Sequence, residues 1–224
     1  MDITKTIILV RHGSTVHNDN DVWQGRSDSS LNDKGRKEAE LLAEELKNEA
    51  FDIVFHSPMK RARETAEIIA KNHNALFKAI DCFIEIDVGD FDGAKNTDII
   101  EQHPEVYRNW IMDIDCAMPA GESFNDVFQR VQPGVEEIME SPYRNILIVA
   151  HAMVNRAILG QLLNMGPIPA RKFRMENCAY SKFYVYDTPH GRHIAVDAWN
   201  NRAHLKNEAH GKHEKHEKKR NDKE

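Results

Sequence analysis

Two histidines follow directly on apolar stretches that are typical of buried strands. His12 comes after residues 7–10 (IILV) and Arg11, and His151 comes after residues 146–150 (ILIVA). The carboxyl ends of parallel strands meet at one edge of a sheet, so we expect both imidazoles at that edge. A lone histidine at a strand end is more often structural, but two, one beside an arginine and a glycine, favour a site. A neutral imidazole supplies a nucleophilic nitrogen near pH 7.

Arg61 adds a third element, in the first turn of a helix predicted to follow another strand end. An arginine is electrostatically disfavoured there, because the helix dipole is already positive. It could be a surface residue that tolerates this position, or it could bind an anion together with the helix end. With Arg11, His12 and His151 it would form a cationic pocket. The natural guest of such a pocket is a phosphoryl group.

Several segments, in their order along the chain, resemble motifs of the histidine phosphatase superfamily, which includes the cofactor-dependent phosphoglycerate mutases. The resemblance spans most of the first 205 residues and is closest to the broad-specificity and α-ribazole phosphatases. The matching segments are residues 9–15 (LVRHGST) with Asn18, 24–28 (QGRSD), 57–66 (SPMKRARETA), 85–93 (EIDVGDFDG), 121–123 (GES) and 149–151 (VAH), with Asn177 and residues 199–200 (WN) further on.

The resemblance implies phosphoryl transfer through a phosphohistidine, without metal or cofactor. It implies His12 as the nucleophile and Glu85 as the proton donor and acceptor. Arg11, Arg61 and His151 would hold the phosphoryl oxygens, His151 as a cation stabilised by the bound phosphate. The remaining substrate-binding positions that it implies are Asn18, Gln24, Gly25 and Ala152.

Two features of these motifs leave room for other interpretations. On the residues alone, Asp87, Asp90 and Asp92 compete with Glu85 for the proton-transfer role. Ala152 stands where the family usually has a glycine. Its backbone N–H is retained, and its methyl group would be costly only if the position needs a positive φ or a close approach.

The segment between Glu85 and His151 favours hydrolysis over mutase activity. His151 follows Glu85 by only 66 positions. The resemblance to glycolytic mutases would imply a longer insertion with an adjacent arginine pair, whereas the first basic residues here, Lys95 and Arg108, are isolated. Tyr107, Trp110 and their neighbours instead predict a short apolar cap. A metal-independent phosphatase of small phosphomonoesters is therefore the prediction, and a cofactor-dependent phosphoglycerate mutase is the alternative.

Two alternatives from other classes stay open. If Ala152 deforms the pocket, the protein could bind a phosphorylated ligand without catalysis. Alternatively, the protein could handle metal through its C-terminal tail. A divalent metal could be held there by three histidines spaced three residues apart, His210, His213 and His216. A solvated tail is the simpler interpretation of those histidines.

The pattern of elements predicts an α/β protein, a three-layer α/β/α sandwich with a mostly parallel central sheet. Asn32 and Ser123 are predicted to cap helices, and Pro133 is predicted to kink or divide the second of these. Another helix is expected over residues 59–72, and a further one from 151 through 163. Strands are expected at residues 6–10, 51–55, 76–83, 145–150, 182–186 and 194–199.

Composition sets the remaining limits. The net charge is −6, and residues 206–224 carry seven basic against five acidic side chains, which leaves −8 on the first 205. This argues against nucleic-acid and membrane partners and favours monophosphates with an uncharged or partly apolar body. We expect a catalytic domain at 1–205 and a disordered tail at 206–224. Three widely spaced cysteines predict a cytoplasmic location, and either a monomer or a homodimer is compatible with the sequence.

Overall fold

A six-stranded sheet forms the centre of the computed structural model, which describes residues 2–205. The strand order is β3-β2-β4-β1-β5-β6. The pairs β3–β2, β2–β4 and β4–β1 are parallel, whereas β5 is antiparallel to both of its neighbours. The strands are β1 (Ile3–Arg11), β2 (Ile53–His56), β3 (Leu76–Ala79), β4 (Asn145–Ala150), β5 (Tyr180–Thr188) and β6 (Gly191–Asn201). The predicted mostly parallel sheet is confirmed.

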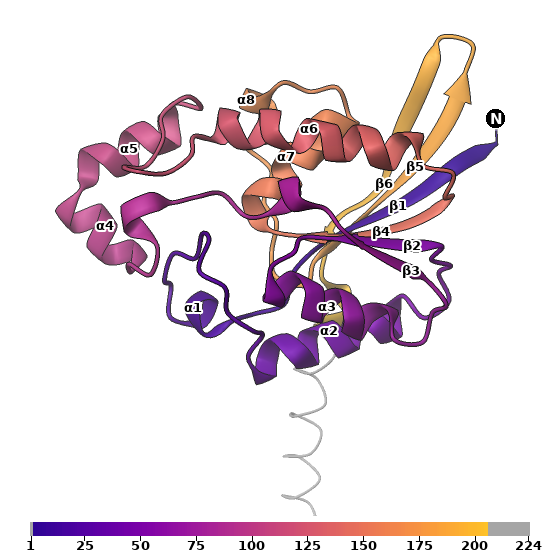
Figure 1. The fold of residues 1–224 in the computed structure, drawn as a ribbon, viewed down its shortest axis with the longest axis horizontal. Coiled ribbons are helices and arrows are strands. Elements are labelled where there is room, and N and C mark those ends of the chain that lie inside the picture. The colour runs from indigo at the N-terminus through magenta and orange to yellow at the C-terminus, as the bar shows by residue number, and fades with distance from the viewer. Residues whose placement is uncertain (1, 206–224) are drawn as a thin grey trace, which may run out of the picture.

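Helices cover both faces of this sheet, as predicted. The helices α2 (Asp33–Glu45) and α3 (Lys60–Ala70) pack on one face, and α6 (Phe124–Glu140) and α7 (Ala152–Leu162) pack on the other (Figure 1). Successive strand residues alternate between the two layers, so that Ile7 belongs to the core under α6 and α7 and Ile8 to the core under α2 and α3. A strand buried on both faces must be apolar throughout, which explains the unbroken run in β1.

Short elements gather beyond the carboxyl ends of the parallel strands (Figure 1). Trp23, Tyr107 and Trp110 pack there around a small buried cluster of Phe91, Ile99 and Met118. This is the apolar cap that the sequence predicts. The elements are α1 (Val16–Asp19), η1 (Asp81–Phe83), η2 (Gly89–Phe91), α4 (Asn96–Gln102), α5 (Pro104–Met112) and α8 (Pro167–Ala170).

Two details of the predicted elements differ from the structure. Pro133 does not divide α6, which runs on to Glu140. Pro133 and Gln129, whose carbonyl loses its helical partner, are both exposed, so water can replace the missing hydrogen bond. The strand expected over residues 76–83 ends at Ala79, and residues 81–83 turn into a 3₁₀ helix that buries Phe83.

The caps that open two helices are confirmed. Asn32 accepts a hydrogen bond from the Gly35 N–H at the start of α2, and Ser123 forms a reciprocal capping box with Asp126 at the start of α6. No helix within residues 2–205 has the length and apolar character needed to cross a membrane. The tail predicted at 206–224, with its histidines, lies outside the described residues, and the division of the chain at 205 stays a prediction.

Candidate active site

The parallel pairing of β1 with β4 brings the two predicted histidines together. Arg11 pairs with Ala150 in register, and the His12 N–H donates to the Ala150 carbonyl over 3.0 Å. The ring centroids of His12 and His151 lie 5.1 Å apart, and both side chains are buried. The register between β1 and β4 fixes the positions of both His12 and His151, so the distance between the two histidines depends on the pairing of these strands.

His12 is oriented with one ring nitrogen toward the backbone and the other free. Its Nδ1 lies 2.8 Å from the Gly13 carbonyl oxygen, which can only accept, so Nδ1 carries the proton. Burial, followed by the positive charges of Arg61 and Arg11, holds the pKa of His12 well below its usual value of 6.5. The ring is therefore neutral near pH 7, with an unprotonated Nε2.

The guanidinium groups of buried Arg61 and half-buried Arg11 flank the histidines, and each is held by carbonyl oxygens. Arg61, fully buried, donates to the carbonyls of Gly25 and Ser27, both over 2.9 Å. Arg11 donates to the Met175 carbonyl over 2.7 Å. Within residues 2–205 neither forms an ion pair, and the Nε of each is buried without an acceptor. Burial lowers the pKa of Arg61 to about 10. Such unpaired cations favour a bound anion.

His151 is held by a serine that the sequence analysis left without a role. Its Nε2 lies 2.7 Å from Ser57 Oγ, and its Nδ1 is buried without a partner. Burial, together with Arg61, His12 and Arg11, holds the pKa of His151 well below its usual value. The cationic form expected from the sequence therefore depends on the negative charge of a bound phosphoryl group.

Glu85 lies against the first turn of the helix that follows His151. The side chain is 5% exposed, its Oε1 accepts from the Ile86 N–H over 2.9 Å, and its Oε2 accepts from the Met153 N–H over 3.4 Å. The competing aspartates lie elsewhere. Asp87 accepts a hydrogen bond from the Gly89 N–H, and Asp90 is exposed. Asp92 accepts hydrogen bonds from the N–H groups of Gly25 and Ser27. Glu85 is thus the carboxylate that the fold brings to the histidines.

An ion-pair network holds the loop that carries Glu85. Arg130 donates to the carbonyls of Cys82 and Ile84, over 2.6 and 2.9 Å, and pairs with Glu122. Glu122 in turn accepts from the Asp87 N–H over 2.9 Å. Sequence reasoning missed the role of these two residues, because most of their partners in the loop are backbone atoms, which carry no side-chain signal.

The predicted substrate-binding positions divide into two groups. Asn18 uses its Oδ1 to accept from the Thr15 N–H and from Asn177, which leaves its amide N–H groups as donors. Ala152 is the first residue of α7, and its φ is not positive, so its methyl group imposes no backbone strain.

Gln24 and Gly25 instead build the loop that holds Arg61. Gln24 accepts from Thr15 Oγ1 over 2.9 Å and donates to Ser29. Gly25 accepts from Arg61, and a Cβ on Gly25 would lie 2.8 Å from the Ile86 carbonyl oxygen. The structure therefore gives both residues a supporting position beside the pocket.

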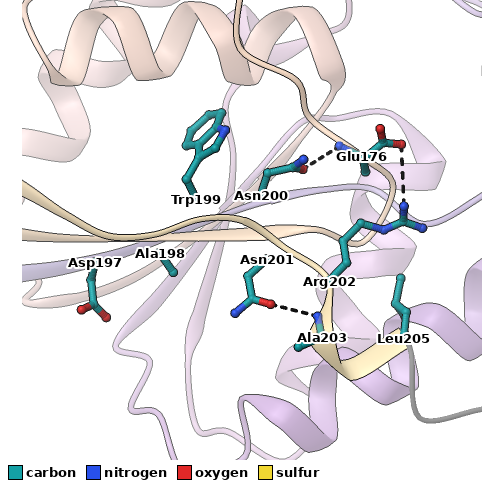
Figure 2. Close-up of a pocket in the computed structure, with 9 residues that line it drawn as sticks. All are labelled: Glu176, Asp197, Ala198, Trp199, Asn200, Asn201, Arg202, Ala203 and Leu205. Atoms are coloured by element: carbon teal, nitrogen blue, oxygen red, sulfur yellow. Dashed lines mark hydrogen bonds and ion pairs between the residues drawn. The ribbon is translucent and has the colours of Figure 1, made fainter.

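Other hollows of the surface lie apart from the histidines. One of about 780 Å³ follows the end of β6, where the Glu176 N–H donates to Asn200 Oδ1 and Arg202 pairs with Glu176 (Figure 2). None of the predicted site residues lines it. No group of three or more metal-ligating side chains occurs within the described part of the chain.

The fold and this paired-histidine, paired-arginine pocket define an α/β protein built to bind a phosphoryl group. Residues 7–202 match the histidine phosphatase superfamily (branch 1), and the chain belongs to this family. Phosphoserine phosphatase 1 of Hydrogenobacter thermophilus is 33% identical over 181 residues, which are 80% of this chain and 86% of that protein.

Two further proteins show the range of the similarity. A Photorhabdus laumondii protein, named as a probable phosphoglycerate mutase, is 28% identical, over 82% of this chain and 86% of its own. The structure of a mycobacterial glucosyl-3-phosphoglycerate phosphatase in complex with VO3 has a TM-score of 0.79 and 26% identity, and the match covers 88% of this chain and 98% of that one.

Proposed function

We propose that this protein hydrolyses small phosphomonoesters without a metal, through a phosphohistidine formed on His12 Nε2. One observation carries the proposal: the Nδ1–H of His12 is bound to the Gly13 carbonyl, so its Nε2 is free, and Arg61 and Arg11 are close enough to lower its pKa while neither forms an ion pair within residues 2–205. A nucleophile is thereby placed where a phosphoryl group would be bound.

In the first step, the Nε2 lone pair forms the N–P bond as the bond from phosphorus to the ester oxygen breaks. Protonated Glu85 gives its proton to the departing oxygen, so that an alcohol leaves and Glu85 becomes a carboxylate. Arg11, Arg61 and cationic His151 stabilise the charge on the three equatorial oxygens, a role that metal ions fill in other phosphotransferases.

In the second step, water attacks the phosphohistidine. Glu85 takes a proton from the water as the new O–P bond forms, and the electron pair of the N–P bond returns to Nε2. Phosphate leaves, and His12 and Glu85 are restored. In this proposal Asn18 and the N–H of Ala152 donate to the phosphoryl oxygens.

Hydrolysis is favoured over the mutase reaction by the cap. Residues 94–120 form only the short helices α4 and α5, with no adjacent arginine pair to grip a substrate carboxylate. The relatives named for phosphoserine and glucosyl-3-phosphoglycerate also support a small phosphorylated substrate. Steady conversion of 3-phosphoglycerate to 2-phosphoglycerate, faster than phosphate release, would establish the mutase instead.

A panel of phosphomonoesters assayed in EDTA tests the proposal. We expect phosphate release that EDTA does not reduce, an acid-labile phosphoenzyme, and loss of both in His12→Ala. Dependence on added Mg²⁺ would contradict the mechanism. Absence of hydrolysis with every ester would favour the non-catalytic ligand binder. Truncation after Leu205 should leave hydrolysis intact. If the protein instead handles metal through its tail, the same truncation should abolish its function.

We also propose a cytoplasmic location and no nucleic-acid partner. The three cysteines are all free, which fits a reducing compartment, and the net charge is negative. Light scattering on the purified protein decides between the monomer and the homodimer.

A further inference from the structure

A second hollow, of about 660 Å³, lies between α5, α7 and the end of α8. Its apolar wall includes Ile111, Met112 and Ile168, whose side chains are 45%, 78% and 60% exposed. Apolar residues are not usually clustered at the surface without a purpose. The remaining lining residues are Trp110, Asp113, Ile114, Asp115, Arg156, Arg171 and Lys172.

Arg156 joins this hollow to the catalytic residues. It lies on α7, five residues after His151, and its NH1 contacts the Met153 sulfur over 3.1 Å. The Met153 N–H in turn donates to Glu85. Burial lowers the pKa of Arg156, whereas the nearby Glu85 carboxylate raises it, and Arg156 itself lowers the pKa of Arg11. Its charge therefore lies between the proposed acid and the hollow.

The guanidinium of Arg156 has a sulfur acceptor, Met153 Sδ, but no oxygen acceptor within residues 2–205. Its Nε is buried without a hydrogen-bond partner, and no ion pair with a carboxylate forms within residues 2–205. The Nε1 of Trp110, in the same wall, is also buried without a partner. A buried N–H without an acceptor destabilises the folded protein, so these two groups favour a ligand with acceptor oxygens.

Arg171 differs from Arg156, because its donors are already used. It donates to the carbonyls of Trp110 and Asp113 and lies 4.7 Å from the centroid of the Trp110 ring. It thus ties the end of α8 to the end of α5 and shapes the hollow. Of the two arginines, Arg156 is the one whose Nε–H and Nη2 groups have no acceptor within residues 2–205, since only its Nη1 is bonded, to Met153 Sδ.

The net charge of the side chains that line this hollow limits the charge of the ligand that it can bind. Three basic side chains stand against Asp113 and Asp115, which gives a net charge of +1. This suits a singly charged carboxylate better than a second, doubly charged phosphate. The paired donors of a guanidinium also match the two oxygens of a carboxylate.

We propose that Arg156 and this hollow form the subsite for the leaving group, and that they select phosphomonoesters whose alcohol has an apolar body and a carboxylate. The proposal rests on the phosphatase function proposed above. It revises the sequence-based expectation of an uncharged body, because Arg156 lines this hollow and is connected through Met153 to Glu85, the proposed acid that faces the leaving group.

A matched pair of esters tests the subsite: 4-carboxybenzyl phosphate and 4-carbamoylbenzyl phosphate, which share a benzyl leaving group and differ in charge. Binding is measured by calorimetry to full-length His12→Ala, which keeps the esters intact. We expect the carboxylate to bind about ten- to a hundredfold more tightly. Adding Arg156→Met should reduce this ratio to about one, while Arg108→Met, on the exposed side of α5, should leave it unchanged.

The outcomes separate the two proposals. Failure of the wild-type protein to hydrolyse either ester would contradict the phosphatase function while the binding ratio still tests the subsite. Equal binding of the two esters, or a ratio that survives Arg156→Met, would overturn the subsite. Tighter binding of 1,4-bis(phosphooxymethyl)benzene than of the carboxylate would overturn the assignment of a carboxylate.

Discussion

The backbone N–H of Met153 donates to Oε2 of Glu85 over 3.4 Å, across 68 positions of sequence. This bond joins the loop that carries the proposed acid to the helix that begins after His151. It brings Glu85 to the first turn of α7, the helix that also carries Arg156. The position of the acid thus depends on packing between two distant segments.

Substitution Glu85→Gln should lower kcat/KM about 10²- to 10⁴-fold for alkyl phosphates, because proton transfer to the leaving oxygen is lost. The loss should be smaller for p-nitrophenyl phosphate, whose leaving group needs little protonation. Steady-state kinetics with both esters measures the difference. Asp90→Asn, which changes an exposed carboxylate nearby, is the control. Undiminished activity of Glu85→Gln would remove Glu85 from the mechanism.

Stability should fall as the pH decreases below about 6.5, the usual histidine pKa. The folded protein keeps His12 and His151 neutral, whereas the unfolded chain takes up protons on both. The contribution of the two neutral rings to the free energy of unfolding is therefore complete above that pH. Below it, this free energy falls by up to about 1.4 kcal/mol per pH unit for each ring.

Urea unfolding of the wild type, His12→Gln and His193→Gln between pH 5 and 7.5 measures this slope. Removing buried His12 should make the slope shallower, and removing exposed His193 should not. An identical slope in all three proteins would contradict the neutral, buried state of His12.

Arg61→Met should separate activity from stability. Loss of a donor to the phosphoryl oxygens should lower kcat about 10²- to 10³-fold. The free energy of unfolding without phosphate should rise by about 1 kcal/mol, because an unpaired buried charge is removed at the expense of two hydrogen bonds to carbonyls. Thermal unfolding with and without phosphate checks this, and a large loss of stability would show that Arg61 is mainly structural.

Ala152→Gly restores the residue that the family usually has and should change kcat/KM less than threefold. Ala152 already has an ordinary φ at the start of α7, so glycine relieves no strain there. Kinetics with p-nitrophenyl phosphate measures the effect. A tenfold gain would mean that the methyl group obstructs the phosphoryl pocket.

Much of the architecture could be predicted because it depends on local patterns. The apolar runs of β1 and β4 and the caps at Asn32 and Ser123 act within a few residues, and the structure confirms them. The short helices α1, α4, α5 and α8 were not predicted, since four to nine residues carry too little periodicity. The helix continues through Pro133, whose exposure depends on packing and could not be predicted from the sequence.

The sequence by itself determined the family, the sandwich and the residues available for phosphoryl chemistry, because ordered motifs and hydrophobic runs are properties of the chain. Only the tertiary structure decided how those residues are used. It gave Gln24 a supporting position in the loop, separated Glu85 from three nearby aspartates, and left the Nε–H of Arg156 without an acceptor beside an apolar hollow. These outcomes depend on which distant backbone atoms a side chain meets, and that information exists only once the sheet and its helices are assembled.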